Sequence, residues 1–274
     1  MAAVRYNTPV HYGEELRATL PAGGFGEILY VYGSIGSTNT RATELAVAGA
    51  VQGTLVVADH QTRGRGRAGT RWFSPAGSSV TMSLILRPAV SSGLRWSGLG
   101  ALAVAKALGE EGLSARIKWP NDVLLDGRKA AGVLVEAAWE GGRPLYMILG
   151  IGINVGARSA PQEEDIGFPA TTVEGEARRP VSRTRLIAGV LRSIESWYGR
   201  VETPDFLGAW EAALAYRGER VRVQTSEAWI EGRLVGLGPA GEARIEMDSG
   251  DMLLAGGDAS QFRPSSLPLQ REGV

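Results

Sequence analysis

A glycine- and arginine-rich segment between residues 61 and 72 contains the side chains best suited to chemistry. Its sequence is Gln61-Thr62-Arg63-Gly64-Arg65-Gly66-Arg67-Ala68-Gly69-Thr70-Arg71-Trp72, so four arginines fall within nine positions. Glycine lets backbone N–H groups approach a ligand closely, and each guanidinium presents a fixed fork of donors that suits a carboxylate or a phosphate. The segment therefore predicts an anion-binding loop. A solvated basic loop, or a nucleic-acid tether of the RGG kind, is the alternative.

A second charged segment places a lysine four residues before an aspartate, in Lys118-Trp119-Pro120-Asn121-Asp122. The proline fixes its own φ and restrains Trp119, which limits the relative orientations of the lysine and the Asn-Asp pair. A lysine can neutralise a phosphate, and Asp122 with Asn121 could hold Mg²⁺ through oxygen ligands, as sites that act on nucleotide phosphates require. An ordinary Asn-Asp turn beside a surface lysine is the alternative.

A third segment, Gly150–Val155, has the period of a strand with two unequal faces. Successive side chains of a strand point to opposite faces, so three aliphatic side chains share one face while Gly150, Gly152 and Asn154 share the other. Glycines within a strand mark close approach by a ligand or by another part of the protein, and an asparagine adds a polar group. The pattern predicts either a ligand groove or close packing on the sheet.

The composition excludes several classes of protein. The 29 basic and 29 acidic residues cancel over 274 positions, whereas nucleic-acid binders usually carry a clear basic excess. The absence of cysteine and the presence of only two histidines argue against disulfides, thiolate zinc sites, cysteine nucleophiles and histidine-rich metal centres. No apolar run approaches the roughly 20 residues that cross a bilayer, and no secretory segment begins the chain, so we expect a cytoplasmic protein.

Strands and one helix are predicted to hold the first chemical segments in place. Period-two patterns predict strands at Ile28–Tyr32, Leu55–Ala58 and Thr81–Leu86, with the arginine-rich loop between the last two. A helix beginning near Ser37 places Ser37-Thr38-Asn39 at its N-terminus, where free backbone N–H groups are available.

The rest of the large domain is predicted from the same kinds of pattern. Helical spacing runs from Trp96 to Lys106, and strands are predicted at 123–125, 130–138 and 146–155. Residues 156–180 lose any period and contain three prolines, which is typical of a mobile loop. We expect the part from Gly156 to Pro169 to act as a lid, with Phe168 as a packing residue.

The C-terminal part changes from helical to strand periodicity after about residue 216. Helices are predicted in 182–198 and 206–214, and short strands at 220–224, 228–236, 243–247 and 252–254 predict a small barrel. The predicted organisation is an N-terminal extension (1–26), a large domain (27–216), a barrel (217–264) and a disordered tail (265–274). The extension contains Pro9, Pro21 and a glycine-rich cluster and shows no sustained period of either kind.

These segments together resemble the biotin protein ligases. Ser37-Thr38-Asn39, the arginine-rich loop, Lys118–Asp122, Gly127-Arg128-Lys129-Ala130-Ala131-Gly132 and Gly150–Val155 occur in the order and with the gaps typical of that family. The resemblance implies an α+β fold, with a mixed-sheet catalytic domain like that of class II aminoacyl-tRNA synthetases followed by an SH3-like β-barrel. It implies that ATP and Mg²⁺ activate biotin to biotinyl-5′-adenylate, from which a lysine of a biotin carboxyl carrier protein takes the acyl group. A lipoate–protein ligase, whose fold is related, is the alternative.

The resemblance also implies roles for single residues. The residues implied to bind biotin are Ser37, Thr38, Asn39, Gln61, Arg65, Gly66, Arg67, Trp72 and Lys129. The residues implied to bind ATP or the adenylate are Arg65, Arg67, Lys118, Asn121 and Asn154. Arg67, Lys118 and Asp122 are implied to be catalytic, with Asp122 also a candidate ligand of Mg²⁺.

Some members of this family carry an N-terminal winged helix-turn-helix domain and act as repressors. Only about 27 residues precede the first predicted strand here, too few for the three helices of such a reader of the major groove. We therefore expect a ligase without repressor activity and without a nucleic-acid partner. Members of the family include monomers and dimers formed by pairing of sheet edges, so a homodimer stays open for this chain.

Overall fold

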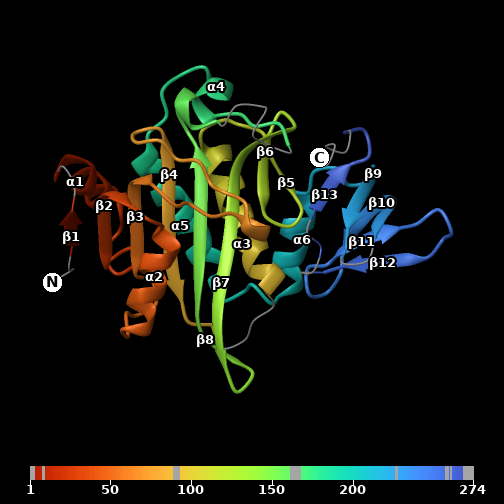
Figure 1. Cartoon of the computed structure of the whole chain (residues 1–274), viewed down its shortest axis with the longest axis horizontal. Helices are drawn as coiled ribbons and strands as arrows, with labels where there is room; N and C mark the ends of the chain where they lie inside the picture. Colours follow the sequence, from red (N-terminus) through yellow and green to blue (C-terminus); the bar gives the residue numbers. More distant parts are fainter. Residues whose placement is uncertain are drawn as a thin grey trace.

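Two sheets organise the chain, as Figure 1 shows. The structure is a computed structural model that describes residues 4–7, 10–88, 93–160, 168–225, 228–256, 259 and 261–267. Within these residues, eight strands form a mixed sheet in the order β1-β2-β3-β4-β8-β7-β6-β5, and five form an antiparallel sheet in the order β12-β11-β10-β9-β13. The predicted fold class, a mixed-sheet α+β domain followed by a small β domain, is confirmed.

The large sheet changes strand direction at β3. Its strands are β1 (Val4–Asn7), β2 (Leu29–Ile35), β3 (Leu55–Gln61), β4 (Ser79–Leu86), β5 (Ala115–Lys118), β6 (Asp122–Leu125), β7 (Arg128–Glu140) and β8 (Arg143–Asn154). The strands β1, β2 and β3 run parallel, and the pairs from β3–β4 to β6–β5 are antiparallel. The arginine-rich loop is the connection between β3 and β4, so the sheet holds both of its ends.

Helices cover both faces of this sheet. The helices of the large unit are α1 (Val10–Thr19), α2 (Thr38–Val47), α3 (Gly93–Glu110), α4 (Val173–Ala177), α5 (Arg183–Tyr198) and α6 (Pro204–Ala212). On β3, Val56 packs with Ala42 and Ala46 of α2, whereas Leu55 and Val57 belong to the main core with α3 and α5. Side chains alternate along a strand, so one strand serves two apolar layers.

The N-terminal segment is more regular than its sequence predicted. No helix or strand was predicted in residues 1–26, but they include β1, which pairs with β2, and α1, which packs on α5. Leu16 and Leu20 are buried in the main core. Pro9 and Pro21 suggested a loop, yet they flank a ten-residue helix, and prolines are common just outside helix ends.

The second sheet packs against the large unit close to Trp119. Its strands are β9 (Arg220–Gln224), β10 (Trp229–Leu237), β11 (Ala243–Glu246), β12 (Met252–Ala255) and β13 (Gln261–Pro264), of which β13 was not predicted. The Trp119 indole N–H donates to the carbonyl of Gly241 at 2.9 Å, and Trp119 packs on Phe262 with ring centroids 5.7 Å apart. The second sheet thus reaches the chemical segment Lys118–Asp122. Of the predicted disordered tail, residues 268–274 lie outside the described residues.

Candidate active site

One cavity of about 650 Å³ gathers every residue that the sequence predicts for the site. The thirteen residues are Ser37, Thr38, Asn39, Gln61, Arg65, Gly66, Arg67, Trp72, Lys118, Asn121, Asp122, Lys129 and Asn154. They come from the start of α2, the end of β3, the arginine-rich loop, the end of β5, the β5–β6 turn and the strands β6, β7 and β8. The fold therefore joins segments that are up to 117 positions apart, from Ser37 to Asn154, around one space.

Uncharged polar side chains line one end of the cavity. The side-chain oxygen of Gln61 accepts from the backbone N–H of Thr38 at 2.7 Å and from its hydroxyl at 3.1 Å. Ser83 of β4 donates to Asn39 Oδ1 at 2.6 Å and lies 2.8 Å from the Thr38 hydroxyl. Ser37 is the N-cap residue of α2, and its side chain makes no capping bond. This end offers donors and acceptors without a net charge.

The glycine face of β8 is filled by two side chains of the site. A Cβ added at Gly150 would lie 2.8 Å from Asn39 Cγ, and one added at Gly152 would lie 2.5 Å from Trp72 Cζ2. Both distances are too short for real carbon atoms, so these positions exclude any larger residue while Asn39 and Trp72 keep their places. The Trp72 indole N–H is buried with no hydrogen-bond partner among the described residues. Gly152 thus leaves room for the Trp72 ring, which forms part of the cavity wall.

The arginine-rich loop holds its two central guanidinium groups in different places. Arg65 pairs with Glu136 of β7 at 3.0 Å, and the same carboxylate accepts from Asn39 Nδ2 at 2.7 Å. Arg67 donates to the carbonyl of Ala259 at 3.0 Å and lies 3.5 Å from Asn121 Oδ1. Burial lowers the pKa of Arg67, which remains a cation at neutral pH. Arg65 therefore faces the uncharged end, and Arg67 faces the end formed by the Lys118–Asp122 segment.

A carboxylate between two lysines forms the cationic end of the cavity. Asp122 Oδ2 pairs with Lys118 Nζ at 2.7 Å, and Asp122 Oδ1 pairs with Lys129 Nζ at 2.5 Å. Burial would raise the pKa of Asp122, but Lys118 and Lys129 outweigh it and hold that pKa below its usual range. Burial lowers the pKa of Lys118, and Asp122 opposes this shift. Two positive charges and one negative charge leave this group net cationic, as binding of an anion requires.

Asp122, the candidate ligand of Mg²⁺, is held between two lysines in this structure. Both carboxylate oxygens already face ammonium groups, and an adjacent cation would be repelled. Within the described residues, no group of three or more acidic or histidine side chains could hold a metal ion. In this structure Asp122 therefore fixes two lysines, and its role as a ligand of Mg²⁺ stays a prediction, because Mg²⁺ is usually held by one or two carboxylates together with substrate phosphates.

The far side of the cavity is closed by the segment that leads into α4. Asn154 Nδ2 donates to the carbonyl of Thr171 at 3.3 Å, and the backbone N–H of Lys129 donates to the carbonyl of Pro169 at 2.7 Å. The ring of Phe168 lies 4.9 Å from Lys118 Nζ. Phe168 is therefore placed where a covering residue is needed, while residues 161–167 of the predicted lid lie outside the described residues.

Three groups of the site were missed by the sequence prediction. Ser83 of β4 and Glu136 of β7 both hydrogen-bond to the predicted residue Asn39. The carbonyl of Ala259, in the C-terminal unit, accepts from Arg67. A strand pattern places Glu136 on the same face as Leu134, but gives no sign of Asn39 as its partner, 97 positions away. Only the tertiary fold reveals these contacts.

Comparison with known proteins identifies the family. A family model described as the biotin/lipoate A/B protein ligase family matches residues 31–154. The bifunctional ligase/repressor BirA of Bacillus subtilis is 34% identical over 242 residues, which cover 86% of this chain and 74% of that protein. A biotin–[acetyl-CoA-carboxylase] ligase of Paracoccus denitrificans is 34% identical over 239 residues, which cover 84% of this chain and 95% of that protein. This chain belongs to the biotin protein ligase family.

A solved structure of the family agrees with the fold. The biotin protein ligase from Aquifex aeolicus in complex with biotin and ATP is 32% identical, with a TM-score of 0.74, and the match covers 86% of this chain and 99% of that chain. The Paracoccus relative is named for biotin, so the lipoate alternative is not favoured. Among the described helices, none has the length and apolar character to cross a membrane.

Proposed function

We propose that this biotin protein ligase activates biotin with ATP and transfers it to a lysine of a biotin carboxyl carrier protein. In the first step a carboxylate oxygen of biotin bonds to the α-phosphorus of ATP, and the bond from that phosphorus to pyrophosphate breaks. In the second step the deprotonated amine of the acceptor lysine bonds to the acyl carbon, and AMP leaves. Neither step requires a nucleophile on the protein, in keeping with a chain that has no cysteine.

The observation that carries the proposal is the polarity of the cavity. Its uncharged end, with Thr38, Asn39 and Gln61, suits the ureido group of biotin, whose N–H and carbonyl groups need partners but no counter-charge. Its other end holds Arg67 and Lys118, two cations that suit a carboxylate and a phosphate. A molecule with a neutral polar head and a terminal carboxylate fits this arrangement.

Individual roles follow from these positions as proposals. Trp72 covers the apolar chain of biotin, and Arg65 and Gly66 contribute to the wall next to it. Arg67 and Lys118 stabilise the charge that develops on the phosphate oxygens, and Lys129 contacts the carboxylate. Asp122 fixes the two lysines. The ligands at the nucleotide side are Asn121 and Asn154.

Pyrophosphate release tests the first step. The purified protein, ATP and Mg²⁺ are mixed with biotin or with lipoate, and Arg67→Ala serves as the control for the site. We expect release with biotin alone and its loss in the Arg67→Ala variant. Release with lipoate alone would move the chain to the sister activity, and no release with either would reject the proposal.

Further properties of the protein belong to the same proposal. We place its action in the cytoplasm, with residues 27–216 as the catalytic domain and 217–264 as an SH3-like domain. The partner is a carrier domain of a biotin-dependent carboxylase, because the Paracoccus relative is named as a biotin–[acetyl-CoA-carboxylase] ligase and the polarity of the site suits biotin. With 29 basic and 29 acidic residues, no repressor activity is expected, and retention on DNA that falls with salt would contradict this. Sedimentation with and without biotin would decide between monomer and homodimer.

A further inference from the structure

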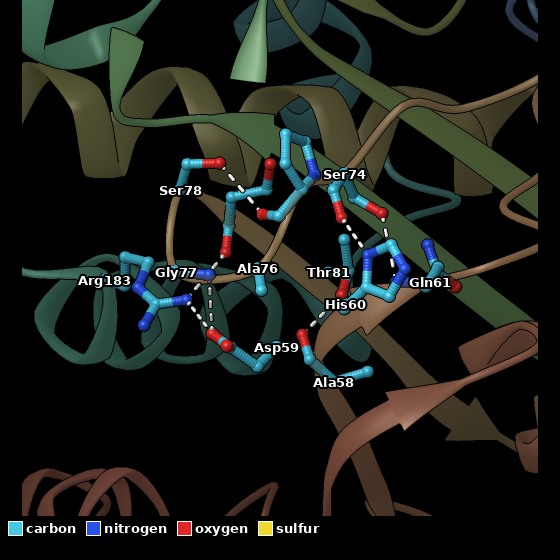
Figure 2. A network of polar contacts seen from close by, with 12 residues as sticks. Ala58, Asp59, His60, Gln61, Ser74, Ala76, Gly77, Ser78, Thr81 and Arg183 are labelled. Carbon is cyan, nitrogen blue, oxygen red and sulfur yellow. Dashed lines mark hydrogen bonds and ion pairs between the residues drawn. The ribbon is translucent and has the colours of Figure 1, made fainter. Parts of the chain in front are cut away.

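The arginine-rich loop is held at its base by a polar network, drawn in Figure 2, that reaches the cavity at Gln61. The loop leaves β3 after Gln61 and returns to β4 at Ser79, so the segment from Ser74 to Ser78 lies beside the end of β3. Asp59 Oδ1 accepts from the backbone N–H of Gly77 at 3.1 Å and pairs with Arg183 Nη1 at 2.5 Å. This pair of residues, Asp59 and Arg183, is called the stem clamp.

A second set of bonds, closer to the cavity, joins the end of β3 to Ser74 in the returning segment of the loop. His60 Nδ1 lies 2.9 Å from the carbonyl of Ser74, and because a carbonyl can only accept, this ring nitrogen carries the hydrogen. The Ser74 hydroxyl accepts from the backbone N–H of Gln61 at 3.3 Å, and Ser74 is 2% exposed. Gln61 in turn binds Thr38 at the uncharged end of the cavity. The base of the loop is thus connected to the proposed biotin site through Ser74 and Gln61.

The stem clamp is itself fixed by contacts with the helices α5 and α1. Arg183, the first residue of α5, also donates to the carbonyl of Ser79 at 3.3 Å, and its guanidinium lies 4.5 Å from the ring centroid of Tyr12 of α1. The neighbouring Thr184 donates to Glu15 of α1 at 2.8 Å. Two helices that contribute nothing to the cavity lining therefore set the position of Arg183 and, through Asp59, of Gly77.

These contacts matter for binding because the loop carries Arg65, Arg67 and Trp72 on a long excursion between two strands. A mobile loop loses conformational entropy when a ligand orders it. Contacts that already hold the base of the loop lower that cost of binding. The stem clamp fixes the segment that leads from Trp72 into β4, whereas Arg67 has separate contacts with Asn121 and Ala259. The clamp therefore acts on the Gln61 and Trp72 side of the loop more than on Arg67.

We infer that Asp59 and Arg183 are positioning residues for biotin binding, which act through the base of the arginine-rich loop. The inference rests on the proposed function in taking biotin as the ligand. It makes the N-terminal helix α1 part of the support of the site, through the contact of Tyr12 with Arg183. If the ion pair only stabilised the fold, its loss would not change the KM for biotin more than the KM for ATP.

Steady-state pyrophosphate release with Asp59→Ala and Asp59→Asn tests the inference. Asp59→Ala should raise the KM for biotin roughly tenfold, the loss expected for a hydrogen bond with a charged partner, and the KM for ATP less. Asp59→Asn keeps an acceptor for Gly77 and should lie between the wild type and Asp59→Ala. In the double variant with Arg183→Ala, the KM for biotin should match that of Asp59→Ala, because the two residues act as a unit.

A matched control comes from the same helix. Arg192 of α5 pairs with Glu110 at 2.7 Å, and both side chains are more than half exposed and remote from the loop. Arg192→Ala should leave both KM values unchanged. Equal changes in Asp59→Ala and Arg192→Ala, or a rise of the same size for biotin and ATP, would overturn the inference.

Trypsin provides a readout that does not depend on activity. Arg63, Arg65, Arg67 and Arg71 are cleavage sites within the loop, so its mobility can be measured directly. Asp59→Ala should be cut faster in the loop than the wild type, at a temperature at which thermal unfolding curves show that both proteins are folded. Wild-type cleavage of Asp59→Ala would overturn the inference. If the wild type releases no pyrophosphate with biotin, the proposed function fails, and the cleavage rates still decide the role of the clamp.

Discussion

The indole ring of Trp72 occupies the space into which a side chain at Gly152 would project. A Cβ at position 152 would lie 2.5 Å from Trp72 Cζ2, so Gly152→Ala must displace the ring. Overpacking of this kind costs about 1 to 3 kcal/mol, and we expect a rise in the KM for biotin of about tenfold. Steady-state pyrophosphate release with varied biotin measures it.

A helical glycine supplies the control for this substitution. A Cβ added at Gly208 of α6 would meet no atom within 4 Å. Gly208→Ala should leave the KM for biotin unchanged and stabilise the protein by about 0.5 to 1 kcal/mol, as expected inside a helix. If Gly152→Ala also kept the wild-type KM, the seat of Trp72 on β8 would have no part in binding.

The carboxylate of Asp122 is expected to stabilise the fold in a pH-dependent way. Asp122→Asn leaves Lys118 and Lys129 without their counter-charge, and we expect a loss of about 3 to 5 kcal/mol in the free energy of unfolding at neutral pH. The two lysines hold the pKa of folded Asp122 below that of the unfolded chain, which is about 3.9. The stabilisation is therefore complete above about pH 4 and declines as the pH falls below it.

Urea unfolding at several pH values separates this charge effect from a change in packing. The difference in unfolding free energy between the wild type and Asp122→Asn should be constant around neutrality and shrink in acid. A difference of the same size well below about pH 4 would show that the variant fails for a reason other than its lost charge.

The sequence predicted the segments of the site but not the contacts that fix them. The period of Gly150–Val155 predicted a face with Gly150, Gly152 and Asn154, and the structure confirms that other groups pack closely on the two glycines. The residues that fill it, Asn39 and Trp72, come from α2 and the arginine-rich loop, and a one-dimensional pattern does not specify which distant segment returns to a strand. Strand period is local information, whereas filling of a groove depends on the tertiary fold.

The missed elements have similar causes. The short helix α1 is flanked by Pro9 and Pro21, which obscured it, although its Leu16 is fully buried. Asp122 was predicted as a candidate ligand of Mg²⁺ together with Asn121, and the structure adds a contact with Lys129, which the sequence does not place beside it. The type of a residue suggests its chemistry, but the charges that the fold brings next to it cannot be read from the sequence.

Glu136 is expected to orient the biotin end of the site from β7. It binds both Arg65 and Asn39, and Glu136→Gln keeps an acceptor for Asn39 while removing the ion pair. Both partners are partly exposed, so the loss should be modest, with a rise of about two- to fivefold in the KM for biotin. Glu140→Gln, at the end of the same strand and four residues from Glu136, is the control. Equal KM values for the two variants would remove Glu136 from the site.

Phe168 is expected to slow the escape of the adenylate. Its ring lies 4.9 Å from Lys118 Nζ, and the Lys118 side chain is 11% exposed, so Phe168→Ala opens the cationic end of the cavity to water. We expect faster release of biotinyl-5′-adenylate into solution, measured by a chase after a single turnover without carrier protein.

Phe168→Leu distinguishes cover from attraction between the ring and the ammonium group. Leucine keeps an apolar side chain over Lys118 but removes the cation–π contact, which is worth about 0.5 to 2 kcal/mol. If cover is the cause, Phe168→Leu should leak at nearly the wild-type rate and Phe168→Ala much faster. If both variants leak equally fast, the aromatic ring acts by holding Lys118 in place, and if neither leaks faster than the wild type, the segment before α4 has no role in retaining the intermediate.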